Sequence, residues 1–144
     1  MDFEDIVRAL RESGGLFQTL EMEGELKDGV VTGRMRIDRK HTGAPGVVHG
    51  GAIMALLDTT FGGAALVHAL PRNRLVSTVE MKVNFLRPAL EGETVVAEAT
   101  LQSAGKSLLV ITGTAKLVSS GEAVAFGVGT FNLFSPEKMG SRPG

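Results

Sequence analysis

The stretch that decides the fold is HGGAIMALLDTTFGGAALVHAL, residues 49 to 70. Its length and composition predict one helix that is apolar on nearly all sides and is closed by Pro71 and Asn73. Asp58 and the Gly62-Gly63 pair interrupt the run, so we expect a buried helix rather than a membrane span. One sheet face cannot cover such a helix, so we expect a second copy of the chain to cover the rest.

The remaining sequence predicts strands joined by short turns. Ahead of the long helix, Asp2 caps a short helix that ends at Gly14-Gly15. Two strands then flank the hairpin signal Lys27-Asp28-Gly29. Strands with short connections must be antiparallel neighbours. The predicted strands cover residues 16–26, 30–37, 75–86, 93–103, 107–118 and 122–134.

These elements predict an α+β fold in which one curved antiparallel sheet of about six strands wraps the long helix. We expect a single domain over residues 1–135 and a frayed polar tail over residues 136–144. Hydrophobic residues make up 43% and charged residues 22% of the chain, as in ordinary globular proteins. The formal net charge of -1 gives no electrostatic case for binding nucleic acid.

The chain contains no cysteine, which excludes disulfides, thiolate metal sites and thiol nucleophiles. Its acidic start lacks the basic and apolar regions of a signal peptide, so we expect a cytoplasmic protein. His41 lies in a predicted loop without a second ligand nearby, and His68 is interpreted as a structural or surface residue. We therefore expect neither a metal nor a cofactor. No P-loop and no Gly-x-Ser-x-Gly elbow is present.

Asp58 is the only charged residue between His49 and Leu70. An unpaired carboxylate in so apolar a helix is costly to desolvate, and such a group suits a general base or a nucleophile. The alternative is a structural aspartate held by hydroxyl partners such as Thr59 or Thr60. Residue chemistry alone leaves both interpretations open.

The turn His49-Gly50-Gly51 opens the helix and is the second candidate for chemistry. The first N–H groups of a helix lack partners and carry the positive end of its dipole. Glycines there let a ligand oxygen approach the backbone, which fits an oxyanion hole for a substrate carbonyl. In the alternative interpretation, the turn is merely glycine-rich and His49 only caps the helix.

The spacing of these two candidates is informative. Asp58 follows His49 by nine residues. At ~100° and ~1.5 Å per residue, it lies about 180° round the helix and roughly 13 Å along it. If both residues are catalytic, they must come from different subunits.

With these residues identified, the chain resembles the hotdog-fold acyl-CoA thioesterases, in particular the phenylacetyl-CoA thioesterase-like family. Two stretches carry the resemblance: GAPGVVHGGAIMALLD over residues 43–58, and VEMKVNFLRP over residues 79–88, followed by Gly92. The resemblance implies a long central helix wrapped by the sheet, and homodimers that often pair into tetramers. It also implies hydrolysis of an acyl-CoA thioester to free CoA and a carboxylic acid.

The resemblance implies a role for each candidate. Asp58 would act as general base on water or attack the thioester directly. The Gly50 N–H would polarise the carbonyl, with His49 supporting the turn. Thr78 matches the position of a Ser or Thr that helps to orient water, with Ser77 as the fallback.

Strict alternation along residues 75–86 turns Thr78 away from Met81 and Val83, so whether Thr78 reaches Asp58 depends on the dimer.

Gly43 departs from the family pattern, because much of the family has an Asn six residues before the His. That change leaves open a different water-positioning scheme, a different substrate subset or lowered activity.

The predicted substrate-binding residues form a wider set. Met54, Phe61 and Phe85 would shape an acyl pocket between the helix and the partner's sheet. Cations for the CoA phosphates would come from Arg72, Arg74, Arg87 and Lys106, each of which can equally be a solvated charge. The set is completed by Gly43, Gly51, Ser77 and Asn84. Two alternatives stay open: a hotdog enoyl-CoA hydratase or dehydratase, and a non-catalytic acyl-CoA-binding protein.

Overall fold

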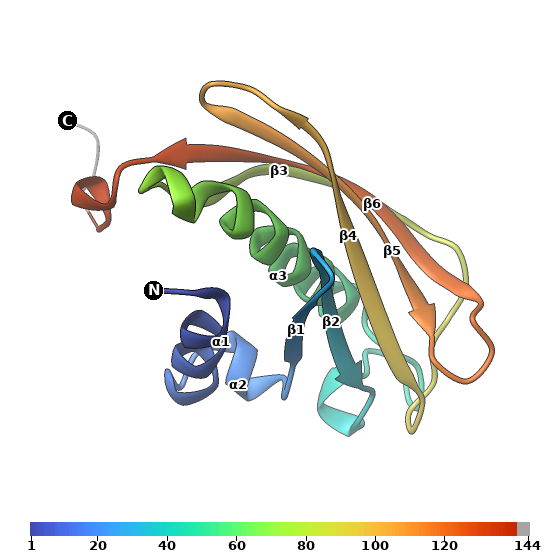
Figure 1. Cartoon of the computed structure of the whole chain (residues 1–144). Helices are drawn as coiled ribbons and strands as arrows, with labels where there is room; N and C mark the ends of the chain where they lie inside the picture. The colour runs from blue at the N-terminus through green and yellow to red at the C-terminus, as the bar shows by residue number, and fades with distance from the viewer. Residues whose placement is uncertain (141–144) are drawn as a thin grey trace.

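A six-stranded antiparallel sheet curls around one long helix (Figure 1). The structure, a computed structural model, describes residues 1–140. The strands lie in the order β1-β2-β4-β5-β6-β3, so β3 is an edge strand. Their bounds are Glu23–Lys27 (β1), Val30–Arg36 (β2), Leu75–Phe85 (β3), Thr94–Ala104 (β4), Leu108–Leu117 (β5) and Ala123–Phe134 (β6). The predicted fold class and the four strands after residue 74 are confirmed.

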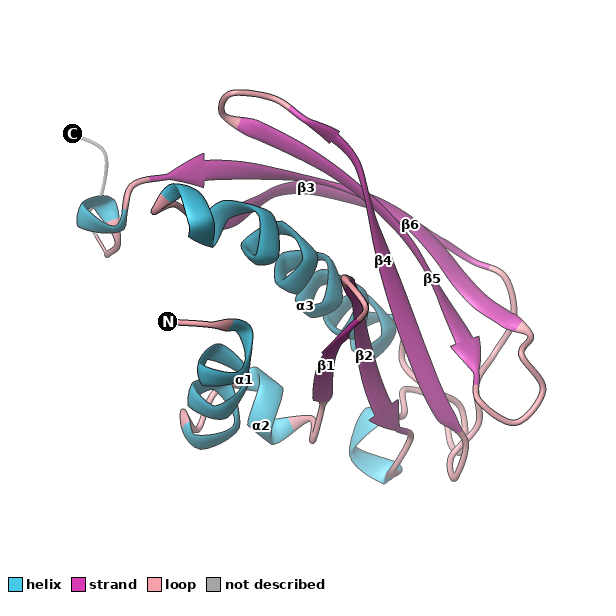
Figure 2. Ribbon diagram, in the orientation of Figure 1, coloured by secondary structure: helices cyan, strands magenta, loops and turns pink. Residues whose placement is uncertain are grey.

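Helix α3 (Gly50–Ala69) is the long helix that the sequence predicts, and His49 is its N-cap. Its sheet-facing side is completely buried at Leu56, Leu57 and Phe61. The Phe61 ring fits because glycines line the facing strands: a Cβ at Gly113 would collide with it. By length and composition alone, the segment Gly50–Arg72 could cross a membrane, but in this fold it is the helix around which the sheet wraps (Figure 2).

The chain leaves α3 through a short 3-10 helix, η2 (Leu70–Arg72), and Asn73 then adopts the left-handed conformation. A second 3-10 helix, η3 (Pro136–Lys138), lies within the predicted tail. Residues 141–144 of that tail lie outside the described residues. The β1–β2 hairpin turns at Asp28 and Gly29, both with positive φ, as its Asp-Gly signal predicts.

The N-terminal segment contains one error of prediction. Residues Leu16–Thr19 form a helical turn, α2, rather than the first half of a strand, and β1 begins only at Glu23. Gly15 starts the turn as its N-cap, and the backbone then closes helical hydrogen bonds. The turn buries Phe17, so it packs as part of a small helical layer with α1 (Phe3–Glu12).

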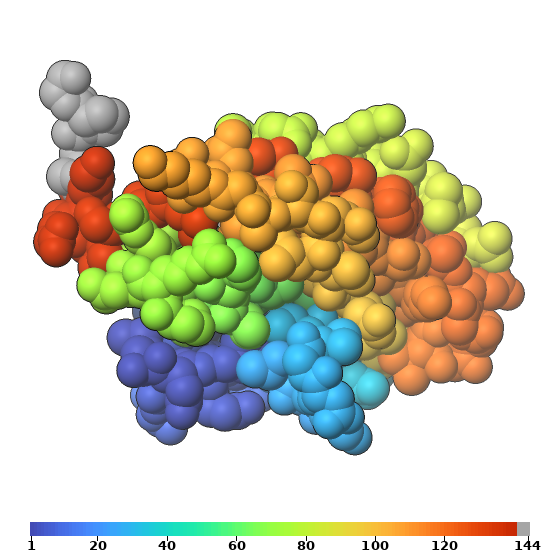
Figure 3. Space-filling model, turned by 45° about the horizontal axis from the view of Figure 1, so that its top comes forward, coloured from blue at the N-terminus to red at the C-terminus, as the bar shows by residue number. Residues whose placement is uncertain are grey.

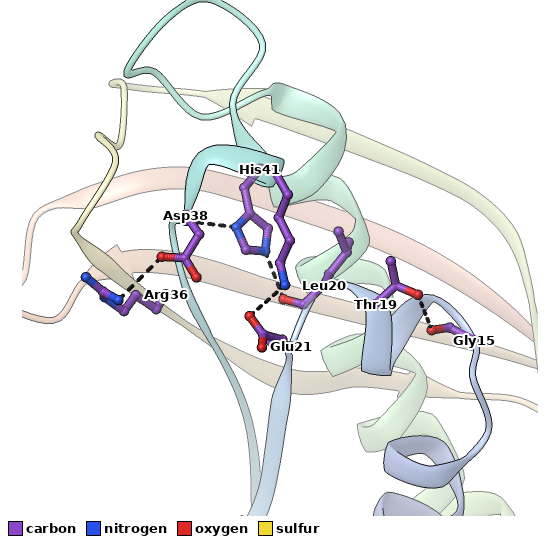
Figure 4. A network of polar contacts seen from close by, with 8 residues as sticks. Gly15, Thr19, Leu20, Glu21, Arg36, Asp38 and His41 are labelled. Atoms are coloured by element: carbon purple, nitrogen blue, oxygen red, sulfur yellow. Dashed lines mark hydrogen bonds and ion pairs between the residues drawn. The ribbon is translucent and has the colours of Figure 1, made fainter.

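His41 fastens this helical layer to the loop before α3 (Figure 4). It ends the 3-10 helix η1 (Arg39–His41) and is completely buried. Its Nδ1 accepts a hydrogen bond from the Asp38 N–H at 2.9 Å, so Nε2 carries the proton and donates to the Leu20 carbonyl at 2.8 Å. The His41 carbonyl accepts from the His49 N–H at 2.7 Å. His41 is therefore a structural residue.

Strand β3 contains a β-bulge that changes which side chains face α3. Its register with β6 passes from Thr78 to Glu80 and skips Val79. Thr78 faces the helix before the bulge, and Met81 and Val83 pack against the core after it. The prediction that Thr78 turns away from Met81 and Val83 is therefore wrong.

Candidate active site

Asp58 and Thr78 form a hydrogen-bonded pair within one chain. Thr78 Oγ1 donates to Asp58 Oδ1 at 2.7 Å. The bond needs no second subunit, which corrects the expectation that it depends on the dimer, and Thr78 makes it rather than Ser77. Thr60, a predicted structural partner of Asp58, instead donates to the Leu56 carbonyl at 2.7 Å. Among residues 1–140, the other carboxylate oxygen of Asp58 has no hydrogen-bond partner and can accept a proton.

The Asp58–Thr78 pair lies where two hollows meet. The first, here called the Asp58 groove, is open and runs along α3 and β3; it is lined by Gly51, Met54, Ala55, Asp58, Thr78 and Met81. The second, here called the α1 cavity, has a volume of 260 Å³ and is lined by residues of α1, α3 and four strands, Asp58 and Thr78 among them. Asp58 and Thr78 are the residues that both hollows share.

Among the residues that the structure describes, the first N–H group of α3, that of Gly50, is free. His49 Nδ1 accepts from the Gly51 N–H at 2.7 Å, and the His49 carbonyl accepts from the Ala52 N–H at 2.9 Å. Within residues 1–140 the Gly50 N–H has no acceptor. His49 thus caps the helix and fixes the turn, and Gly50 holds the donor that is available to a ligand.

Gly43 contacts the site through His49. A Cβ built on Gly43 would lie 3.0 Å from Cδ2 of the His49 ring, and its three nearest neighbours all belong to His49. The Gly43 N–H donates to the Val47 carbonyl at 3.0 Å and closes the loop. A larger side chain at position 43 would therefore press on the imidazole that caps α3.

Gly50 and Asp58 lie far apart in one chain. Asp58 follows Gly50 by eight positions in the helix, which corresponds to about 12 Å along the axis. Gly50 lines a third hollow, the Gly50 hollow, together with Phe85 and Arg87. One thioester carbonyl cannot contact both groups of a single chain.

The other predicted binding residues are distributed widely. Phe61 is 0% exposed and lines neither hollow beside Asp58, so it is a core residue. Asn84 is exposed and pairs with Phe126 of β6. Met54 lines the Asp58 groove and Ser77 lines the α1 cavity.

The predicted cations do not form one cluster. Arg87 lines the Gly50 hollow beyond the end of β3 and forms an ion pair with Glu122. Lys106 lies in the β4–β5 turn, at the opposite end of the sheet (Figure 1). The segment with Arg72 and Arg74, through which the chain leaves α3, lies near this same end of the sheet. A ligand with phosphates would therefore meet Arg87 or the other group, but not all four in one chain.

Two histidine observations complete the site region. His68, near the end of α3, has a buried Nε2 without a partner in residues 1–140. Burial first, and the charge of Arg72 second, lower the pKa of His68. Within the described residues, no group of three His, Asp or Glu side chains is arranged to hold a metal ion.

Comparison with known sequences identifies relatives. Residues 45–123 match the sequence family described as the thioesterase superfamily. Acyl-coenzyme A thioesterase 13 of Homo sapiens is 31% identical over 99 residues, 65% of this chain and 69% of that protein. A candidate esterase of Archaeoglobus fulgidus is 35% identical over 75 residues, 52% of this chain. The matched region spans 46% of that relative, about half its length.

Solved structures show the same fold. A thioesterase of Haemophilus influenzae superposes with a TM-score of 0.86 at 20% identity, over 98% of this chain and 96% of that one. The PaaI protein of E. coli, from the phenylacetic acid degradation operon, superposes with a TM-score of 0.80 at 20% identity, over 92% and 94%. The architecture is the hotdog fold.

Proposed function

The chain belongs to the thioesterase superfamily, and from that membership we propose that it is an acyl-CoA thioesterase that releases free CoA and a carboxylic acid. The observation that carries the proposal is the position of the Asp58–Thr78 pair, at the meeting point of an open groove and an apolar cavity. Such a position suits a carboxylate that acts on a substrate whose two halves occupy different hollows.

Asp58 acts as general base in the proposed reaction, or as the nucleophile. Thr78 holds one carboxylate oxygen, and the other takes a proton from water as the water oxygen attacks the thioester carbon. Collapse of the tetrahedral intermediate breaks the C–S bond, and the proton passes to the CoA sulfur. In the nucleophilic variant, an Asp58 carboxylate oxygen attacks the carbonyl carbon, the C–S bond breaks and CoA leaves as the thiolate, which takes a proton from water. Water then hydrolyses the mixed anhydride to the carboxylic acid and regenerates the Asp58 carboxylate.

The oxyanion donor in this proposal is the Gly50 N–H of a second copy. The Gly50 N–H supports this role because it has no acceptor among residues 1–140 of its own chain. Because Gly50 and Asp58 lie too far apart along α3 to contact one carbonyl, the donor must come from another chain. The edge strand β3 and the open side of α3 offer an apolar surface for that copy: Val79 is 56% exposed and Phe85 53%. We propose a homodimer through this surface, and a tetramer formed from two dimers.

A hydratase is less well supported than a thioesterase. It would need the imidazole of His49 to exchange protons with the substrate. The Nδ1 atom of that ring already accepts the Gly51 N–H, so only Nε2 remains available.

The test is free-thiol release from a panel of acetyl-, hexanoyl- and phenylacetyl-CoA. We expect release by the wild type and a fall of about a hundredfold in Asp58→Asn. Asp28→Asn, the same change in the β1–β2 turn, is the matched control and should remain active. No release from any thioester contradicts the proposal, and hydration of an enoyl-CoA without free thiol would favour the hydratase.

A further inference from the structure

The α1 cavity has the properties of a binding pocket for an apolar chain. It lies between helices α1 and α3. Helix α1 packs beneath α3 and beside the β1–β2 hairpin (Figure 3). Phe3, Ile6 and Leu10 of α1 line one side, and Leu66 of α3 lines another. Asp58 and Thr78 line it where it meets the Asp58 groove. The chain therefore places an apolar pocket directly behind its candidate catalytic carboxylate.

Two adjacent glycines of α3, Gly62 and Gly63, make this pocket possible. A Cβ on Gly63 would lie 3.0 Å from Val31 Cγ1 and 3.3 Å from Phe3 Cε2, so Gly63 lets α1 and β2 approach α3 closely. A Cβ on Gly62 would instead have Phe131 Cε1, at 3.7 Å, as its nearest neighbour. Gly62 lines the cavity, and any side chain there would occupy part of its space.

We propose that the α1 cavity holds the acyl chain, that the preferred substrates are CoA thioesters of medium-length aliphatic acids such as hexanoate and octanoate, and that Gly62 sets the accepted length. The inference rests on the proposed function for the chemistry at Asp58. The Asp58 groove would then hold the thioester and the adjoining part of CoA.

Size and polarity select this substrate class. The volume of 260 Å³ lies just below the usual range for small-molecule pockets, ~300–1,000 Å³, and so suits a medium-length chain rather than a long fatty acyl group. Each methylene that enters an apolar pocket favours binding by about fourfold. Besides Asp58, the charged residue that lines the cavity is Glu23, so an acyl group with a terminal carboxylate is disfavoured.

The kinetic test measures kcat/KM for octanoyl-CoA and butyryl-CoA in the wild type, Gly62→Ala and Gly62→Val. We expect the wild type to prefer octanoyl-CoA, and the octanoyl-to-butyryl ratio to fall by about tenfold or more in Gly62→Val. Gly62→Ala should lower the ratio while raising Tm, because alanine is the better helix former. Ala9→Val, on the exposed side of α1, is the control and should keep the wild-type ratio. An unchanged ratio in both Gly62 variants overturns the inference.

A binding test separates this inference from the proposed function. Octyl-CoA and butyl-CoA thioethers cannot be hydrolysed, and calorimetry gives their dissociation constants directly. If the wild type binds octyl-CoA more tightly than butyl-CoA and Gly62→Val loses this difference, the result supports binding of the alkyl chain in the α1 cavity, even if no thioester is hydrolysed. Equal binding of the two thioethers by the wild type contradicts it, whatever the enzyme's activity.

Discussion

Thr78 on the edge strand β3 donates a 2.7 Å hydrogen bond to Asp58 on the central helix, and the bulge at Val79 makes this contact possible. Strict alternation that keeps Met81 against the core would place Thr78 on the outer face of the sheet. The extra residue reverses that phase, so Thr78 and Met81 both face α3. A local irregularity of one strand thus determines the partner of the candidate catalytic carboxylate.

Replacing Thr78 by Val keeps the shape of the side chain but removes the hydrogen-bond donor to Asp58. A hydrogen bond to a charged group contributes about 1.5–3 kcal/mol, so we expect kcat to fall by roughly tenfold to a hundredfold with a smaller change in KM. Thr78→Ser should restore most of the activity, and Thr100→Val, the same change at an exposed position of β4, is the matched control. Steady-state kinetics check the prediction, and a Val variant with wild-type kcat would contradict it.

His49 should contribute to stability as the N-cap of α3. Its Nδ1 accepts the Gly51 N–H, and His49→Ala leaves that donor unsatisfied. We expect a loss of about 1 kcal/mol in the free energy of unfolding, measured by urea titration at a fixed protein concentration. His49→Asn retains a capping oxygen and should lose less. Equal stability of the two variants would show that the cap is not important.

His68 should make the fold less stable in mild acid. Burial lowers its pKa in the folded state below the unfolded value, so the unfolded chain binds more protons as the pH falls. Its contribution to stability is therefore present above the unfolded pKa and is lost as the pH falls through the folded pKa. Between about pH 8 and pH 5, the wild type should lose more unfolding free energy than His68→Gln. Parallel pH profiles for the two proteins would refute this.

The regular elements could be predicted from the sequence because their signals are strong and local. The apolar run after His49 predicts α3, and the Asp28-Gly29 turn predicts the β1–β2 hairpin. The short helix Leu16–Thr19 could not be predicted this way, because one helical turn has too little periodicity to distinguish it from a strand. Tertiary packing of Phe17 beneath α1 decides its conformation.

The sequence singles out candidate residues for the site but does not predict the contacts between them. The isolated charge of Asp58 and the glycines after His49 identify the candidates. The Asp58–Thr78 bond depends on the bulge, which leaves no clear mark in the alternating sequence of β3. The α1 cavity also escapes sequence reasoning, because it arises where α1 packs over Gly62 and Gly63.

We propose that each active site combines Asp58 of one copy with the Gly50 N–H of another, and mixing two inactive variants tests this arrangement most directly. Asp58→Asn removes the carboxylate. Gly50→Pro removes the N–H at the first position of α3, where proline is compatible with a helix. Each variant alone should be almost inactive in thiol release from hexanoyl-CoA.

Unfolding and refolding the two variants together in equal amounts should restore about a quarter of the wild-type rate, because half of the dimers are mixed and each has one intact site. Refolding either variant alone is the control. If the mixture stays as inactive as its components although mixed dimers form, Asp58 and Gly50 do not act across the subunit interface.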